Sequence, residues 1–163
     1  MPEKNESRRV LEEAIRFETD GREFFLKAAE KARNYFAKVI FQILAEEELD
    51  HIRKVKKIHE GTLTSAKQEI PLSAPKQSNL QNVFQQAKAQ MGQNVTVDAD
   101  EMEAIRLAIQ LEIKGHEFYK RLAEEATNDF EKAFYQHLAQ EESVHFSVLR
   151  QMEEAVMNPA SFG

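Results

Sequence analysis

The chain has 163 residues, 42% of them hydrophobic and 31% charged, a composition typical of one globular domain and not of a disordered or collagen-like chain. Its formal net charge of -6 without a basic stripe argues against nucleic-acid binding, and the absence of cysteine excludes disulfides, thiolate nucleophiles and cysteine-ligated iron–sulfur clusters. No apolar segment approaches the ~18–20 residues that cross a bilayer, so we expect a cytoplasmic protein without membrane partners.

The first predicted element is a helical hairpin over about residues 8–60. Apolar residues recur at steps of three and four over residues 11–29 and again over residues 37–58, a spacing typical of amphipathic helices. Asn34 marks the short turn between them. A short turn makes the two helices antiparallel neighbours.

A long crossover is predicted over about residues 61–98, because this segment contains two prolines and many small polar residues. Helical spacing of apolar residues predicts one short helix within it, over residues 79–91, with Ser78 as its cap. We expect this helix to pack outside the other helices.

A second hairpin is predicted over about residues 99–157. Asp98 or Asp100 can cap its first helix, Asn128 marks its turn, and the tail at residues 158–163 is expected to fray. The second hairpin repeats the first: a shift of 94 residues aligns residues 11–58 with residues 105–152 without a gap, and 18 of the 48 pairs are identical.

The repeat predicts how the two hairpins associate. Each hairpin has an apolar stripe that a chain of this length can bury only against the other hairpin. The predicted fold is therefore an all-α four-helix bundle in a single domain over residues 1–163.

Ionisable residues interrupt the apolar stripes at equivalent places in both copies. A Glu-x-x-His motif stands on the stripe of the second helix and of the fourth, and a single glutamate interrupts the stripes of the first and third. The residues are Glu18, Glu48, His51, Glu112, Glu142 and His145. We expect all six side chains to meet at one level of the bundle.

These residue types in the core predict a metal centre. Removing a carboxylate from water costs several kcal/mol, and four carboxylates at one level repel each other, so positive charge must lie among them. Two divalent cations balance four glutamates, and this ligand set is that of di-iron and di-manganese proteins with metals in a bundle core. Carboxylate with imidazole suits iron or manganese. We expect two iron ions, with manganese or zinc as alternatives.

Several other polar residues lie near the predicted centre. Four glutamates beside the stripes either face solvent or support the metal ligands: Glu23, Glu47, Glu117 and Glu141. Three histidines have no counterpart in the other copy and are interpreted as surface residues: His59, His116 and His137. Tyr119 lies two turns beyond Glu112 on the same face and could approach the metals, but its counterpart is Phe25, which favours plain core packing.

The sequence resembles the rubrerythrin-like branch of the ferritin-like superfamily over both hairpins. The strings that carry the resemblance are Glu18-Thr-Asp-Gly-Arg-Glu-Phe-Phe, Leu44-Ala-Glu-Glu-Glu-Leu-Asp-His51, Glu112-Ile-Lys-Gly-His-Glu-Phe-Tyr and Leu138-Ala-Gln-Glu-Glu-Ser-Val-His145. The resemblance implies that Glu48 and Glu142 bridge two irons, that Glu18 and Glu112 are terminal ligands, and that one histidine binds each iron.

The chain departs from this family in two respects. Typical rubrerythrins carry a rubredoxin domain with four cysteines that passes electrons to the irons, whereas this chain has no cysteine and would need an external electron donor. They also carry a second glutamate three residues after the ligand of the third helix, where this chain has Gly115.

The favoured hypothesis is a non-haem di-iron oxidoreductase that reacts with hydrogen peroxide or O2, with peroxide reduction as the activity that the resemblance implies. One alternative is iron oxidation and handling of the ferritin type. The other is a helical scaffold that holds a structural metal. We also expect a homodimer, in which the long crossover leaves room for hairpins to be exchanged between chains.

Overall fold

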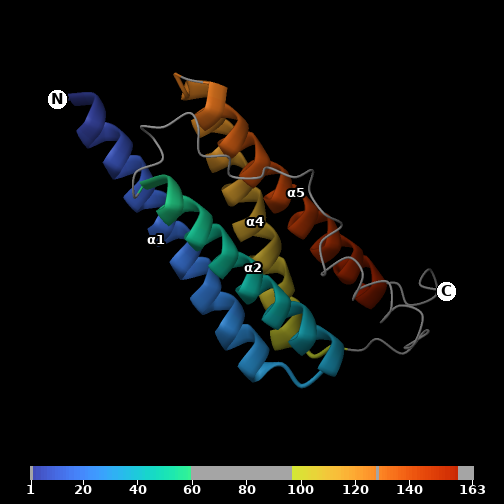
Figure 1. Cartoon of the computed structure of the whole chain (residues 1–163). Helices are drawn as coiled ribbons and strands as arrows, with labels where there is room; N and C mark the ends of the chain where they lie inside the picture. Colours follow the sequence, from blue (N-terminus) through green and yellow to red (C-terminus); the bar gives the residue numbers. More distant parts are fainter. Residues whose placement is uncertain (1, 60–96, 128, 158–163) are drawn as a thin grey trace.

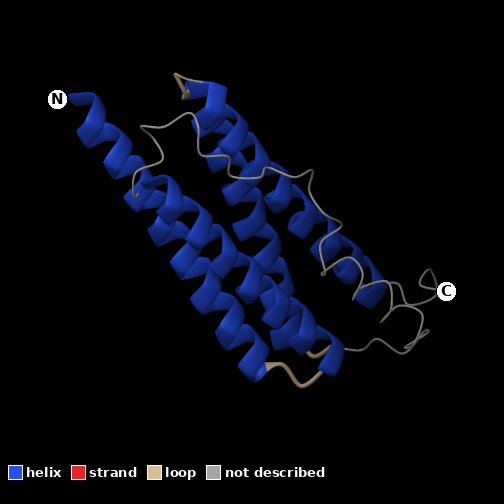
Figure 2. Cartoon of the chain, viewed as in Figure 1, coloured by secondary structure: helices blue, strands red, loops and turns tan. Residues whose placement is uncertain are grey.

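The computed structural model describes residues 2–59, 97–127 and 129–157, and within them the chain forms four helices and no strand (Figures 1 and 2). The helices are α1 (Pro2–Lys31), α2 (Tyr35–His59), α4 (Ala99–Glu125) and α5 (Asp129–Met157). The predicted helix at residues 79–91, the tail at 158–163 and Asn128 lie outside the described residues.

The helices form two antiparallel pairs, α1 with α2 and α4 with α5, that lie side by side (Figure 1). The α4 helix begins at the end of the bundle where α1 turns into α2, so α2 and α4 run in the same direction. The end of α2 and the beginning of α4 therefore lie at opposite ends of the bundle. This arrangement is the ferritin-like four-helix bundle, and the predicted fold class is confirmed.

The beginnings of α2 and α4 are fixed by side-chain caps that meet each other. Asn34 Oδ1 accepts a hydrogen bond of 2.9 Å from the backbone N–H of Ala37, which makes Asn34 the cap of α2. Asp98, not Asp100, caps α4 in a capping box with Glu101. The second carboxylate oxygen of Glu101 accepts a 2.9 Å hydrogen bond from the backbone N–H of Asn34, so one buried carboxylate joins the two hairpins.

The α1 helix begins at Pro2, six residues before the start of the predicted hairpin. Proline suits the first position of a helix, where its missing N–H would have no partner in any case. The residues that follow are mostly charged and lack an apolar stripe, so periodicity could not indicate this part of the helix.

The core consists of two apolar clusters with the six ionisable residues between them along the helices. The turn-end core contains Phe25, Ala29, Phe36, Ala37, Ile40, Phe41, Ile43, Leu44, Ala45, Ile105, Ala108, Ile109, Val148, Leu149, Met152 and Ala155. The far-end core contains Leu11, Ala14, Val55, Ile58, Tyr119, Leu122, Ala123, Phe134, Tyr135, Leu138 and Ala139. All four helices contribute to both clusters, so the two hairpins bury their stripes against each other as the repeat predicts.

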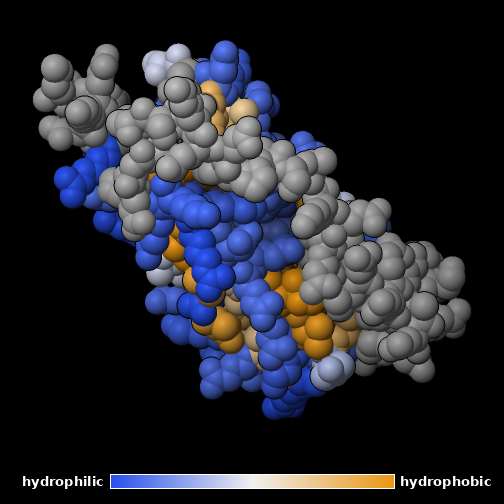
Figure 3. Space-filling view, viewed as in Figure 1, coloured by the Kyte–Doolittle hydropathy of each residue, from blue (hydrophilic) through white to orange (hydrophobic). Residues whose placement is uncertain are grey.

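The outer surface of the bundle is mainly hydrophilic over α1 and α2, with a hydrophobic area near the beginning of α2 (Figure 3). Among the described residues, no helix combines the length and the apolar character that crossing a membrane requires.

Candidate metal centre

The six predicted site residues meet in the middle of the bundle. The helices contribute one glutamate each from α1 and α4 and a Glu-x-x-His pair each from α2 and α5, and each of these residues is at most 3% exposed. They form two overlapping groups of four, whose potential ligand atoms all lie within 4.8 Å of one another. The Glu18 set contains Glu18, Glu48, His51 and Glu142, and the Glu112 set contains Glu48, Glu112, Glu142 and His145.

The two sets share Glu48 and Glu142. These are the glutamates of the two Glu-x-x-His motifs, which the resemblance implies to be bridges. One carboxylate within reach of two ligand groups can place an oxygen on each of two neighbouring cations. Each of the two overlapping sets is therefore able to hold a metal ion.

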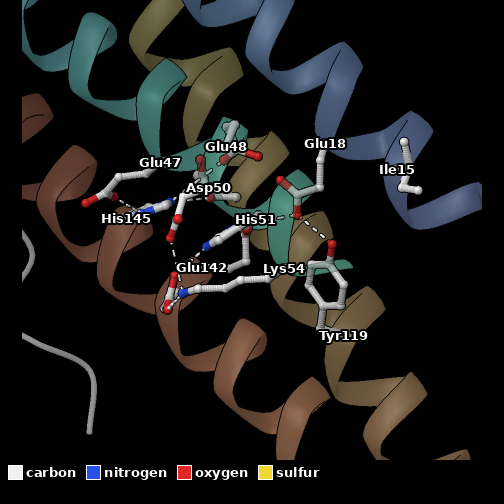
Figure 4. Close-up of polar contacts among 12 residues, drawn as sticks. Ile15, Glu18, Glu47, Glu48, Asp50, His51, Lys54, Tyr119, Glu142 and His145 are labelled. Atoms are coloured by element: carbon white, nitrogen blue, oxygen red, sulfur yellow. Dashed lines mark hydrogen bonds and ion pairs between the residues drawn. The ribbon is translucent and has the colours of Figure 1, made fainter. Parts of the chain in front are cut away.

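Each histidine of the centre turns one ring nitrogen toward the carboxylates and the other toward a glutamate of the opposite hairpin (Figure 4). His51 Nδ1 lies 3.0 Å from Glu142 Oε1, while its Nε2 forms a 2.5 Å hydrogen bond with Glu141. The Nε2 of His145 forms an ion pair with Glu47 in the same way. A carboxylate that accepts from Nε2–H leaves the Nδ1 lone pair as the metal ligand.

These two contacts show which of the four glutamates beside the apolar stripes support the candidate ligands and which face solvent. Glu47 and Glu141 are half-buried and support the histidines, whereas Glu23 and Glu117 are exposed. Glu47 directly precedes Glu48 and contacts His145 of the other hairpin. Glu141 directly precedes Glu142 and contacts His51 of the other hairpin. The signal in the sequence was that both copies carry a glutamate at this position.

Glu141 is held by two further residues that the sequence analysis missed. Lys54 Nζ donates to Glu141 Oε1 at 2.8 Å, and His137 Nε2 lies 2.5 Å from the same oxygen. Burial opposes the charge on Glu141, but His137, His51 and Lys54 outweigh burial and lower the pKa of its carboxyl. The interpretation of His137 as a surface residue is wrong, because its side chain is only 12% exposed and pairs with Glu141.

The other two histidines without a counterpart are placed differently. His116 is half-buried, and its Nδ1 lies 2.8 Å from the backbone carbonyl oxygen of Ala139, so it too is not a plain surface residue. The side chain of His59 lies outside the described residues.

Tyr119 contacts the centre and does more than pack in the core. Its hydroxyl donates a 2.6 Å hydrogen bond to Glu18 Oε1, and its side chain is fully buried. The preference for plain core packing was wrong because it relied on the counterpart Phe25, which has no hydroxyl. Burial and the neighbouring Glu18 carboxylate both raise the pKa of Tyr119, which keeps the phenol protonated as a donor.

Electrostatics divide the four ligand carboxyls into two kinds. Burial opposes ionisation of Glu18, but His51, Glu48 and Tyr119 together outweigh burial and lower the pKa to about 2. His145 lowers the pKa of Glu112 in the same way, again against burial. Glu48 and Glu142 have raised pKa values, because burial and the surrounding carboxylates both disfavour their charge. The two carboxyls at the shared positions are thus the ones whose charge the two histidines do not offset.

The histidines show the complementary shift. Burial disfavours the charged imidazole, but Glu18 and Glu141 outweigh it and raise the pKa of His51. Glu112 and Glu47 raise the pKa of His145 against the same effect of burial. The centre thus attracts positive charge strongly, as a cation site requires.

Unpartnered atoms also fit a cation. Glu18 Oε2, His51 Nδ1 and Glu142 Oε1 are buried and have no hydrogen-bond partner of suitable geometry among the described residues. Buried polar atoms normally have partners, and these three belong to one set of potential ligands. A metal ion within this set would satisfy all three atoms.

Gly115 of α4 leaves room for the carboxylate of Glu142 on α5. A Cβ added at Gly115 would lie 2.7 Å from Glu142 Oε2 and 3.1 Å from Phe17 Cε1, so a side chain at this position would displace the Glu142 carboxylate. At the equivalent Gly21, the nearest atom is Glu48 Oε2 at 3.6 Å, an ordinary contact. The second glutamate of typical rubrerythrins, which would stand at Gly115, therefore has no space in this arrangement.

Comparisons with known proteins agree with the fold. A sequence model of the family described as rubrerythrin matches residues 9–153. A solved structure described as a hypothetical protein from Pyrococcus furiosus is 24% identical, with a TM-score of 0.66, and the match covers 93% of this chain and 90% of that chain. No curated protein matches the sequence.

Proposed function

This chain belongs to the rubrerythrin family, and from that premise we propose that it is a non-haem di-iron oxidoreductase that reduces hydrogen peroxide, or O2, with electrons from an external donor. The observation that carries the proposal is the pair of overlapping four-residue sets that share Glu48 and Glu142. Two neighbouring metal ions between shared carboxylates are suited to a two-electron oxidant.

The donor set favours iron among the candidate metals. Four carboxylates carry the charge of two divalent cations, and nitrogen is supplied by one imidazole in each set. Imidazole combined with carboxylate suits iron or manganese, although such ligands bind zinc more tightly. Manganese and zinc are therefore outcomes that a metal analysis must distinguish.

The protein residues have separate tasks in this proposal. Glu48 and Glu142 would bridge, Glu18 and Glu112 would each bind one metal ion, and Glu141 and Glu47 would hold the two histidines with Nδ1 toward the metals. When bound, two ferrous ions supply one electron each, so that hydrogen peroxide takes up two electrons and two protons and gives two waters. The apolar cores on both sides keep bulk water from the centre.

The electrons that restore the ferrous state would come from another molecule. The chain has no cysteine, so no rubredoxin-type centre can be built from its residues. A separate reductant or electron-transfer protein is the partner that the proposal requires. Glu47 and Glu141 are partly exposed, and each contacts one histidine of the centre, so they connect the protein surface with the proposed metal ligands.

Metal content per chain is the first test. The full chain, purified without chelator, is expected to contain two irons, or to take up two ferrous ions anaerobically. The Glu48→Ala, Glu142→Ala double variant should lose both, whereas Glu23→Ala, which removes an exposed glutamate, should keep both. No metal after loading would contradict the di-iron proposal and favour a scaffold, and zinc that iron cannot replace would favour a structural metal.

Reaction with peroxide is the second test. The reduced, iron-loaded chain is expected to consume hydrogen peroxide faster than the same concentration of free ferrous iron, and faster than the iron-loaded form consumes O2. A rate no higher than that of free iron would contradict peroxide reduction.

Iron oxidation of the ferritin type is the second candidate, and Gly115 is the observation that favours it. The family glutamate that would stand there takes part in the peroxide cycle, and this chain has no room for it. Repeated oxidation of added ferrous iron by O2, faster than peroxide consumption, would support this candidate. A gel-filtration peak at the size of a monomer or dimer would exclude a large storage shell.

A further inference from the structure

The two ligand sets differ in how their own atoms are engaged. Glu18 Oε2, His51 Nδ1 and Glu142 Oε1 are buried without a hydrogen-bond partner of suitable geometry, and Glu142 belongs to both sets. His51 Nδ1 still lies 3.0 Å from Glu142 Oε1 and 3.4 Å from Glu18 Oε1, so both histidines contact carboxylates of the centre. The terminal glutamates differ, because Glu112 Oε2 forms a 3.3 Å hydrogen bond with His145 Nδ1 whereas Glu18 Oε2 has no partner. A cation therefore reaches Glu18 Oε2 without displacing a hydrogen bond to that oxygen, but must displace one to reach Glu112 Oε2.

The terminal glutamates are also held differently. Tyr119 fixes Glu18 by donating to Oε1 at 2.6 Å, which leaves Oε2 for a metal. The equivalent residue in the other hairpin is Phe25, which cannot donate to Glu112. Fixing a ligand before binding lowers the conformational entropy that binding removes. Glu18 is thus better preorganised than Glu112.

The histidines show the same asymmetry. His51 is held by Glu141, which is itself fixed by Lys54 and His137. His145 is held by Glu47, but the positions equivalent to Lys54 and His137 are Val148 and Ile43, which are apolar and buried. The glutamate that holds His51 is therefore itself held by two side chains, whereas the glutamate that holds His145 has apolar residues at the equivalent positions.

We infer that the two metal sites load in order, the Glu18 set first and tightly and the Glu112 set second and more weakly, with Tyr119 as the positioning residue that sets the difference. The inference rests on the proposed two-metal centre. Its consequence is a species with one metal per chain, bound by the Glu18 set, in which the Glu112 set is empty and the His145–Glu112 hydrogen bond is intact.

Cobalt(II) binding to the metal-free full-length chain tests the order without relying on activity. Calorimetry is expected to resolve two steps of one equivalent each, with at least tenfold different affinity. The strongly contact-shifted NMR signals of a cobalt-bound imidazole should appear for His51 at the first equivalent and for His145 only at the second; through-space broadening does not discriminate, because the two rings lie 5.6 Å apart. Two steps of equal affinity, or contact-shifted signals of His145 first, would overturn the order while leaving the two-metal centre in place.

Moving the hydroxyl tests the role of Tyr119. Tyr119→Phe should weaken the first step by about 10- to 100-fold, the usual effect of removing a residue that orients a metal ligand, and leave the second step within a few-fold. The exchanged variant Tyr119→Phe, Phe25→Tyr should strengthen the second step relative to Tyr119→Phe alone. Circular dichroism must show that both variants fold. An unchanged first step in folded Tyr119→Phe would overturn the positioning role, and failure of the unmodified chain to bind any cobalt would overturn the metal centre itself.

Discussion

Burial of side chains has opposite effects on stability at the apolar ends of this bundle and in its polar middle. In the turn-end and far-end cores, each fully buried Val, Leu, Ile, Phe or Met side chain stabilises the fold by about 1.5–3 kcal/mol. In the middle, six ionisable side chains are buried just as deeply, and two of their carboxyls have raised pKa values because neighbouring carboxylates repel their charge. The apolar cores at the two ends stabilise the packing of the helices. In the middle, the buried carboxylates repel each other, and a bound cation would reduce this unfavourable electrostatic energy.

The largest expected effect comes from breaking an apolar end. Phe41 is fully buried in the turn-end core and stacks on Phe25, with ring centroids 6.3 Å apart. Phe41→Ala is expected to lower the free energy of unfolding by about 3–5 kcal/mol, as measured by urea denaturation. If metal binding in the middle does not depend on packing at the ends, the folded variant keeps its metal stoichiometry. Loss of metal from a fully folded variant would contradict that independence.

Metal binding should stabilise the folded chain, because a cation reduces the repulsion between the buried carboxylates in the middle of the bundle. A ligand that binds only the folded state at a free concentration 1,000 times its Kd stabilises that state by about 4 kcal/mol. Ferrous iron added anaerobically should therefore raise the Tm of the metal-free chain by roughly 8–16 °C. Differential scanning calorimetry measures the shift, and the Glu48→Ala, Glu142→Ala double variant is the matched control that should not respond.

Removing charge from the middle should stabilise the metal-free chain and abolish metal binding. Glu48 has mainly carboxylates as its electrostatic neighbours, and methionine has a similar volume. Glu48→Met is expected to raise the free energy of unfolding of the metal-free chain by about 1–3 kcal/mol, by analogy with buried ionic groups replaced by apolar ones. A destabilised metal-free variant would show that the middle layer is already well compensated without a cation.

The smallest effect comes from a matched pair of glycines beside the bridging carboxylates. Gly21→Ala makes only an ordinary contact with Glu48 and removes a helical glycine, so it should stabilise the chain by about 0.5–1 kcal/mol. Gly115→Ala must move Glu142 and should weaken metal binding without that gain. Equal behaviour of the two variants in calorimetric metal titrations would contradict the closer packing at Gly115.

The helices and the six convergent residues could be predicted from the sequence because they depend on periodicity along single helices and on the repeat. Glu48 and His51 fall on an apolar stripe, and a stripe residue points to the core whichever helix covers it. The contacts of Glu141 with His51, Lys54 and His137 could not be predicted in this way. They depend on which face of α2 meets α5, and Glu141 lies just off the stripe, where only the neighbouring hairpin decides between burial and solvent.

Tyr119 illustrates the same limit. Its position on the face of Glu112 was visible, but its hydrogen bond is to Glu18 of the other hairpin. The spacing within one helix carries no information on the distance to a second helix. Comparison of the two copies also misled, because the copies share their ligands and differ in the residues around them.

The Glu101 carboxylate makes the bundle tolerant of changes in the connection between its hairpins. It accepts from the backbone N–H of Asp98 in the capping box of α4 and also from the backbone N–H of Asn34, so the start of α4 is held by the α1–α2 turn. Each doubling of a connection costs only about 0.6 kcal/mol in closure entropy. Insertions or deletions within residues 61–96 can therefore accumulate, or be engineered, while the register of the four helices and the level of Glu112 stay the same.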